Sequence, residues 1–379
     1  SKRPNIIFIF TDQQSANMMS CAGNNNLNTP AMDYLAAQGV RFSRAYCTNP
    51  VCLPSRFSLM TGRMPSSAGI RSNAWKEETT GIPDSIFDNG IGKLFKEAGY
   101  DAVYGGKVHL PGFNPGDIGF DPLTADRRGE LAETCADYIK NHDQDNPFFM
   151  VSSFINPHDI CYMAITDYAE KQGNMDKYEH NPDYQVLQNV LEEKDKYDSE
   201  QFYNEICPSL PDNLEPQENE PDAVKKFLDQ RPFRRNAREN YSDRDWKLHR
   251  WAYCRLTEMV DKKIQIILDA LQEKGIEEET IIIFSSDHGD HDGAHRMEHK
   301  STLYEEVCRI PFIISDNGDR SGVVDNEHLI SNGLDFIPTI FDYAGIEPPE
   351  TDPKDRSIKS LMENKKVDWR DTVKIESVV

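Results

Sequence analysis

Short apolar runs alternate with amphipathic segments over most of the chain. Three runs are rich in Ile and Phe and are bounded by polar residues, which is typical of strands buried on both faces, and a fourth, "DAVY", is a short strand candidate. They cover residues 5–11, 101–104, 147–155 and 280–286. Helix-like segments separate them. This alternation predicts an α/β fold with a large, mostly parallel sheet sandwiched by helices.

Three helices are predicted from their boundary residues. One begins at Thr29 and Pro30 and ends at Gly39, and a long one repeats Leu256, Val260, Ile264, Ile267 and Leu271 before Gly275. The third covers residues 54–62, "PSRFSLMTG", with Pro54 as its first residue. Cys52 therefore lies just ahead of this third helix.

Residues 160–250 differ from the rest of the chain. They are dense in Asp, Glu, Asn, Gln and Lys, and their apolar positions lack a sustained period. We expect a polar lid or insertion here, with disorder as the alternative. Within it, "RPFRRNAR" (Arg231–Arg238) is a basic cluster, which is either a solvated charge run or an anion-recognition surface.

Polar residues follow all four predicted strands. In an open parallel sheet the carboxyl ends of the strands share one edge, where ligands bind. The residues that follow the strands are Asp12 and Gln13; Lys107 and His109; His158 and Asp159; and Asp287 and His288. We therefore predict a functional site at this edge.

Two carboxylates, an amide oxygen and an imidazole suggest a cation site. Asp12, Gln13, Asp287 and His288 together suit a hard divalent ion such as calcium or magnesium. Each aspartate alone could equally cap a following helix. The set as a whole favours the metal.

The cysteines are scattered, without the paired spacing of zinc sites or the density of a disulfide scaffold. They are Cys21, Cys47, Cys52, Cys135, Cys161, Cys207, Cys254 and Cys308. Most are expected to be free core thiols. Cys52 differs by its position at a helix start, where the free amides attract an anion, with Arg56 one turn further on. These residues indicate an anion-handling metal site without naming the anion.

Composition excludes some partners. The 379 residues carry 64 acidic and 42 basic side chains, a formal charge of −22, which disfavours nonspecific nucleic-acid binding. No apolar run approaches the roughly 18 residues of a membrane-spanning helix. The first residues, "SKRPNIIFIFTD", lack the cleavage site of a signal peptide.

The chain resembles the type I, formylglycine-dependent sulfatases of the alkaline phosphatase superfamily, and among them the bacterial carbohydrate sulfatases. "CLPSR" (residues 52–56) resembles their modification signature, and "SLMTGR" its continuation. "PNIIFIFTDQ", "GGKVHL", "NPHD" and "SSDHGDHDGAHRMEHK" resemble further family motifs in the expected order. Val108 stands where the family usually has tryptophan, and Gln13 where many members have aspartate.

The resemblance implies a reaction. Cys52 would be oxidised to formylglycine by a formylglycine-generating or anaerobic sulfatase-maturating enzyme, and its aldehyde would hydrate to a gem-diol. One hydroxyl would attack the sulfur of a sulfate ester or sulfamate, and the other would then expel sulfate. The implied substrate is a sulfated carbohydrate, in particular a glycosaminoglycan-type sugar.

The resemblance also implies roles for single residues. Calcium, or alternatively magnesium, would be bound by Asp12, Gln13, Asp287 and His288. Arg56 and Lys107 would stabilise the ionised diol, and His109 would accept its proton. His158 and Lys300 would clamp the sulfate, and one of them would protonate the leaving oxygen.

For the whole chain, the resemblance implies an alkaline phosphatase-like catalytic domain over residues 1–368, including the lid at 160–250. Residues 369–379 would begin a small antiparallel C-terminal subdomain that is largely absent from this chain. A periplasmic or secreted location is expected. Two alternatives stay open: a phosphonate monoester or phosphodiester hydrolase with the same site, and an inactive sulfatase-like binding protein. The sugar, the sulfate position and the oligomeric state are not predicted.

Overall fold

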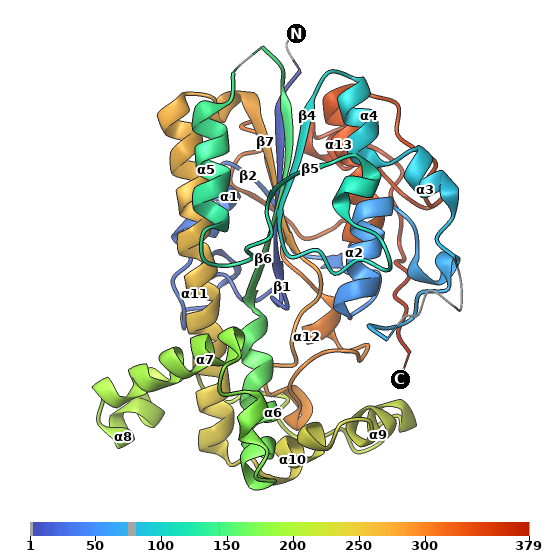
Figure 1. Cartoon of the computed structure of the whole chain (residues 1–379). Coiled ribbons are helices and arrows are strands. Elements are labelled where there is room, and N and C mark those ends of the chain that lie inside the picture. Colours follow the sequence, from blue (N-terminus) through green and yellow to red (C-terminus); the bar gives the residue numbers. More distant parts are fainter. Residues whose placement is uncertain (1–2, 75–80, 144, 379) are drawn as a thin grey trace.

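The computed structural model describes residues 3–74, 81–143 and 145–378. Within these residues a central eight-stranded sheet has the order β5-β4-β6-β1-β7-β8-β2-β9 (Figure 1). Its strands are β1 (Asn5–Asp12), β2 (Gly39–Phe42), β4 (Asp101–Gly106), β5 (Asp121–Thr124), β6 (Phe148–Pro157), β7 (Thr280–Ser286), β8 (Phe312–Ser315) and β9 (Val323–Asp325). A small sheet pairs β3 (Ala45–Tyr46) with β10 (Ile330–Ser331).

The four strands predicted from sequence are neighbours in this sheet. β4, β6, β1 and β7 run parallel to one another, and β8 is antiparallel to both of its neighbours. β7 has the predicted bounds, whereas β4 and β6 each continue two residues further than predicted, because ladder pairing persists into the polar ends. The mostly parallel α/β fold is confirmed.

Helices cover both faces of the sheet (Figure 1). Side chains of β1 alternate between the two layers, as strand geometry requires: Ile6, Phe8 and Phe10 pack with α2, α4 and α13, while Ile7 and Ile9 pack with α1, α5 and α11. The bounds are α1 (Pro30–Ala37), α2 (Cys52–Thr61), α3 (Asp84–Asp88), α4 (Ile91–Glu97), α5 (Leu131–Asn141), α11 (Asp243–Lys274), α12 (Glu305–Cys308), α13 (Asn332–Ala344) and α14 (Lys359–Met362).

The polar stretch after β6 is helical. Residues 161–240, called here the inserted helices, contain α6 (Cys161–Lys171), α7 (Pro182–Glu192), α8 (Ser199–Gln201), α9 (Asp222–Asp229) and α10 (Pro232–Asn240). They gather beyond the sheet end at which β6 leads into α6 (Figure 1). Their separate core includes Leu187, Phe202, Trp246 and Trp251. The helices are too short for a sustained period to show in the sequence.

The long helix begins earlier than predicted. α11 starts at Asp243, so residues 243–250, assigned to the polar insertion from sequence, form its first turns. Ser242 caps it through a reciprocal pair with Asp245, and Gly275 ends it as predicted. Trp246 and Trp251 on these turns face the inserted helices, which is why the apolar spacing of the rest of α11 does not extend to them.

The end of the described chain packs back against α13 and against the segments that carry Ser66 and Ser301. After α14, Arg370 pairs with the buried carboxylate of Asp335, and Glu376 accepts a hydrogen bond from the backbone N–H of Ser66 at 3.0 Å. Ser377 donates to the carbonyl of Ser301 at 2.6 Å. The prediction that a further subdomain begins here stays a prediction. Across the described residues, no helix combines the length and apolarity needed to cross a membrane.

Candidate active site

The polar strand ends meet at one edge of the sheet, as predicted. β1 ends at Asp12, β7 leads into Asp287 and His288, and β6 leads into His158. Lys107 follows β4, and its ammonium contacts the Asp12 carboxylate. Because these strands are parallel neighbours, residues as far apart in sequence as Asp12 and His288 share one buried site.

Cys52 is the first residue of α2, which corrects the predicted start at Pro54. Proline in the first helical turn loses no intrahelical hydrogen bond, so Pro54 tolerates the earlier start. Val51 is extended and precedes the helix, and Gly62 ends it as predicted. The Cys52 side chain is 1% exposed and faces the strand ends.

Four side chains converge on one point: Asp12, Cys52, Asp287 and His288, called here the strand-end cluster. Their ligand atoms all lie within 4.8 Å of one another. The Sγ of Cys52 is 3.1 Å from Nε2 of His288 and 3.7 Å from Oδ1 of Asp12. Nδ1 of His288 hydrogen-bonds the carbonyl of Gly289 at 2.9 Å, which directs Nε2 into the cluster.

Arg56 holds the two carboxylates apart. Its Nη2 lies 2.9 Å from Oδ2 of Asp12, and its Nε lies 2.9 Å from Oδ2 of Asp287. All three side chains are at most 1% exposed. Each carboxylate therefore keeps its Oδ1 for the cluster. Nη1 of Arg56 donates to the hydroxyl of Ser153 at 2.7 Å and to the carbonyl of Lys107 at 3.1 Å. Arg56 acts here as a positioning residue.

These donors fit a divalent cation. Two Oδ1 atoms and one imidazole nitrogen converge in a buried space, and carboxylate oxygen is the preferred donor for calcium and magnesium. Burial, and then repulsion by the nearby Asp12 charge, raise the pKa of Asp287, whereas Lys107 and further cationic neighbours outweigh burial and hold the pKa of Asp12 well below its usual range. A cation would relieve this repulsion.

Gln13 lies beside the cluster, with a fixed amide. Its Nε2 donates to Asp290 at 2.7 Å, which turns Oε1 toward Lys300, 2.9 Å away. Cys161 also donates to Oε1, at 3.1 Å. The backbone N–H of Gln13 donates to Oδ1 of Asp287 at 3.0 Å. Its role as a metal ligand stays a prediction.

Cationic groups surround residue 52. Nζ of Lys300 lies 2.9 Å from Sγ of Cys52. Burial and Asp12 oppose ionisation of the thiol, yet Lys107, Lys300 and His288 outweigh them and hold the pKa of Cys52 well below its usual range. By contrast, burial raises the pKa of Cys135 to about 11. The site is built to hold negative charge at position 52.

The two remaining histidines differ. Nδ1 of His158 is buried without a hydrogen-bond partner among the described residues, and burial together with Lys300 holds the pKa of its imidazole well below the usual value. His109 is half-buried on the loop after β4, at φ 48°. No hydrogen bond or ion pair in the described part of the chain joins it to Cys52, so its role as a base stays a prediction.

Several supporting residues were not singled out from sequence. Ser153 interrupts the apolar run of β6 and accepts from Arg56, and Ser55 donates to the carbonyl of Asp287 at 2.6 Å. Asp290 accepts from Gln13 and from the backbone of His299, at 2.7 and 3.0 Å. A polar residue inside a buried strand was the available signal for Ser153.

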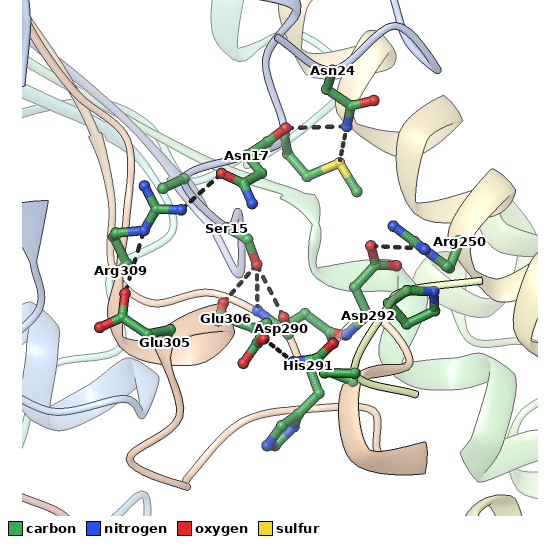
Figure 2. A pocket seen from close by; sticks show the side chains of 15 residues that line it. Ser15, Asn17, Asn24, Arg250, Asp290, His291, Asp292, Glu305, Glu306 and Arg309 are labelled. Atoms are coloured by element: carbon green, nitrogen blue, oxygen red, sulfur yellow. Dashed lines mark hydrogen bonds and ion pairs between the residues drawn. The ribbon is translucent and has the colours of Figure 1, made fainter. Parts of the chain in front are cut away.

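A pocket of about 180 Å³ lies behind the loop that carries Asp290 (Figure 2). Ser15 bridges its walls by accepting from the N–H of Asp290 at 3.0 Å and donating to the carbonyl of Glu306 at 2.8 Å. The imidazole of His291 points away from it, with Nε2 2.7 Å from Oγ1 of Thr302. These bonds stabilise the loop after His288 and do not reach residue 52.

Comparisons with known proteins agree with this geometry. The family whose model matches is described as Sulfatase, and the match covers residues 4–346. A Delta 4,5-hexuronate-2-O-sulfatase of Bacteroides thetaiotaomicron is 28% identical over 366 residues, 92% of this chain and 69% of the relative. An N-acetylglucosamine-6-O-sulfatase of the same organism is 28% identical over 424 residues, 98% of this chain and 73% of the relative. The solved structure of a 2-O GAG sulfatase superposes with a TM-score of 0.78 and 25% identity, covering 96% of this chain and 75% of that chain.

Proposed function

The chain belongs to the sulfatase family and is a sulfuric ester hydrolase, and we propose that its substrate is a sulfated carbohydrate of the glycosaminoglycan type, with residue 52 as the nucleophile. The observation that carries the proposal is the position of the Cys52 side chain. It lies inside a buried group of cation ligands and 2.9 Å from the Lys300 ammonium. The names of the two bacterial relatives support a sugar substrate.

The proposal includes oxidation of Cys52 to formylglycine by a formylglycine-generating or anaerobic sulfatase-maturating enzyme. When hydrated, the aldehyde supplies two hydroxyls on one carbon, so that sulfate can be expelled without a separate nucleophile. The surroundings of residue 52 suit this chemistry. Lys300, Lys107 and His288 already stabilise an anion at this position, as the low pKa of the Cys52 thiol indicates against the opposing effect of burial.

Asp12, Gln13, Asp287 and His288 would hold a divalent cation, calcium in the first place and magnesium as the alternative. The ion would supply positive charge for the nucleophile and for a sulfate oxygen. The chain prepares its position through Arg56, which binds Oδ2 of each carboxylate at 2.9 Å and leaves Oδ1 of each directed toward the cluster.

Sulfate binding falls to Lys300 and His158. Although burial opposes it, negative charge at Cys52 and at the Asp12 carboxylate raises the pKa of Lys300, so this group is protonated at neutral pH. His158 has a buried Nδ1 without a partner in the described chain, which a sulfate oxygen or the leaving oxygen would satisfy. One of the two would deliver the proton to the leaving oxygen, and His109 would accept a proton from residue 52.

The test is sulfate release from defined sulfated mono- and disaccharides, measured beside a phosphodiester and a phosphonate monoester. We expect turnover of at least one sulfated sugar, loss of turnover in Cys52→Ala, and retention in Cys135→Ala, which removes an equally buried thiol from α5. Faster cleavage of the phosphodiester or phosphonate than of every sulfated sugar would replace this proposal with the alternative hydrolase. Native protein that binds such sugars with Cys52 unconverted and releases no sulfate would identify a binding protein.

The proposal also includes a periplasmic or secreted location, since polymeric sulfated sugars are met outside the cytoplasm. The named relatives are bacterial, which supports a bacterial enzyme of this kind. Fractionation of native cells, followed with an antibody to this chain, tests the location. Recovery in the cytoplasmic fraction alone would contradict it.

A further inference from the structure

The inserted helices carry a basic cluster whose arginines differ in one respect. Arg235 pairs with Asp229 and with Glu239, and it is 46% exposed. Arg238 pairs with Glu220 at 2.6 Å. Arg234, which directly precedes Arg235 on α10, has no carboxylate within ion-pair distance in the described part of the chain.

The guanidinium of Arg234 is held in place but not satisfied. Its Cζ lies 3.9 Å from the ring centroid of Phe227 and 5.8 Å from that of Phe233. Nη1 donates to the carbonyl of Phe227 at 3.2 Å, while Nε is buried without a hydrogen-bond partner in the described structure. Stacking on an aromatic face fixes the plane of a guanidinium and leaves its edge free for an oxyanion.

A cation without a counter-ion is unfavourable at this depth. Burial, and then the neighbouring Arg231 charge, lower the pKa of Arg234 to about 10. Among the described residues no acid compensates for this, although the chain has 64 acidic residues. A half-buried cation without an acidic partner in so acidic a protein suggests that its partner comes from outside the chain.

Arg234 lies next to the strand-end site. The ring of Phe233 packs 4.9 Å from the ring of His299, and His299 immediately precedes Lys300. Burial is the main cause of the low pKa of His299, followed by the charges of Arg234 and then Lys300, so this histidine lies within the field of both cations. Cys161 also influences the pKa of Arg234, and its Sγ is 3.1 Å from Oε1 of Gln13.

We infer that Arg234 binds a second anionic group of the sugar, a carboxylate or another sulfate, while Lys300 and His158 hold the sulfate to be removed. This inference rests on the proposed function and adds the requirement for two negative charges on the substrate. A protein with a formal charge of −22 repels polyanions over most of its surface, so recognition of such a sugar depends on local, unpaired cations. Arg234 provides a fork that fits two oxygens of one oxyanion.

The experiment compares three substrates: an unsaturated uronate 2-sulfate, glucosamine 2-N,6-O-disulfate, and a neutral sugar monosulfate. The variants are Arg234→Met, which keeps an apolar stem on Phe227, and Arg235→Met as the matched control on the same helix. We expect Arg234→Met to lower kcat/KM about 10- to 100-fold on at least one doubly anionic sugar, mainly through KM, and to leave the neutral sugar within about threefold. Arg235→Met should change kcat/KM by no more than about threefold on any of the three substrates.

A decrease in kcat/KM of Arg234→Met on the uronate alone identifies a carboxylate as the partner of Arg234. A decrease on the disulfate alone identifies a second sulfate as the partner. Equal loss on all three substrates, or loss on none, would overturn the inference. Wild-type protein that releases sulfate from no sugar would overturn the proposed function itself, which is a different result from an active wild type with an unaffected variant. Should Arg234→Met fail to fold, Arg234→Lys keeps the charge and loses the fork. Selective loss in that variant supports the inference, and its absence overturns it.

Discussion

The strand-end cluster and the inserted helices differ in where their charged side chains lie and in how these side chains are paired. In the cluster, every ionic group is buried and is held by at least one neighbour, as Arg56 holds Asp12 and Asp287 at 2.9 Å. In the inserted helices most ion pairs are at the surface, such as Arg235 with Glu239, and the half-buried Arg234 has no acidic partner among the described residues. Buried, paired charges fix the chemistry of a site, whereas an unpaired one leaves room for a ligand.

The largest effect is expected from Arg56→Met. Removal of this cation takes one partner from each of two buried carboxylates, and the loss of one member of a buried pair typically lowers the free energy of unfolding by about 3–5 kcal/mol. Urea denaturation measures it, with Arg235→Met as the control, for which we expect a change within about 0.5 kcal/mol. A similar decrease in the free energy of unfolding in Arg56→Met and Arg235→Met would contradict the difference between the buried ion pairs of the cluster and the exposed ion pairs of the inserted helices.

Lys300→Met should affect chemistry more than folding. We expect kcat/KM for a sulfated sugar to fall about 100- to 1000-fold, because a buried donor aimed at residue 52 is lost. In protein that retains Cys52, the same change should raise the pKa of the thiol, so that thiolate absorbance at neutral pH disappears. Lys226→Met, on α9 of the inserted helices, is the control. An unchanged pKa of the Cys52 thiol in Lys300→Met would contradict the role of Lys300 in stabilising negative charge at residue 52.

Cation binding should depend on the cluster alone. A calcium concentration of about 100 times Kd should raise the free energy of unfolding by about 2.7 kcal/mol, because the ion binds only the folded chain. Thermal unfolding with and without a chelator shows this shift. Asp12→Asn should abolish the shift, while Asp183→Asn, which removes a buried carboxylate from α7 of the inserted helices, should keep it. A shift that survives in Asp12→Asn would place the ion elsewhere.

The smallest effect concerns the helix that joins the two regions. Ser242 caps α11 through Asp245, and Ser242→Ala should lower the free energy of unfolding by about 1 kcal/mol. Turnover of a neutral sulfated sugar should stay within about twofold, because the capped turns support Trp246 and Trp251 rather than the cluster. A fall in turnover well beyond twofold, in protein that is still fully folded, would show that the inserted helices also position the reacting groups.

The strand-end site was largely predictable because its signals are local. A buried strand is a continuous apolar run, and the polar residue that ends it is adjacent in sequence, as with Thr280–Ser286 followed by Asp287. Parallel order then brings these ends together without further information. The start of α2 was less certain, because Pro54 is compatible with more than one position in the first turn.

The inserted helices were less predictable for a physical reason. Their core depends on aromatic contacts between segments far apart in sequence, such as Phe202 with Trp251, whose ring centroids are 5.1 Å apart. The difference between Arg234 and Arg235 is likewise a matter of which acids lie within reach in three dimensions. The orientation of the Gln13 amide depends in the same way on Asp290, a residue 277 positions away.

The most direct test of the central claim joins the chemical state of residue 52 to turnover. Protein is produced with and without a maturation enzyme, the peptide that contains residue 52 is analysed by mass spectrometry, and sulfate release is measured on the same samples. We expect turnover to rise in proportion to the fraction of Cys52 that has lost its sulfur and gained an aldehyde oxygen, and Cys52→Ala to stay inactive under both conditions. Full turnover in a sample whose residue 52 is entirely cysteine would contradict it.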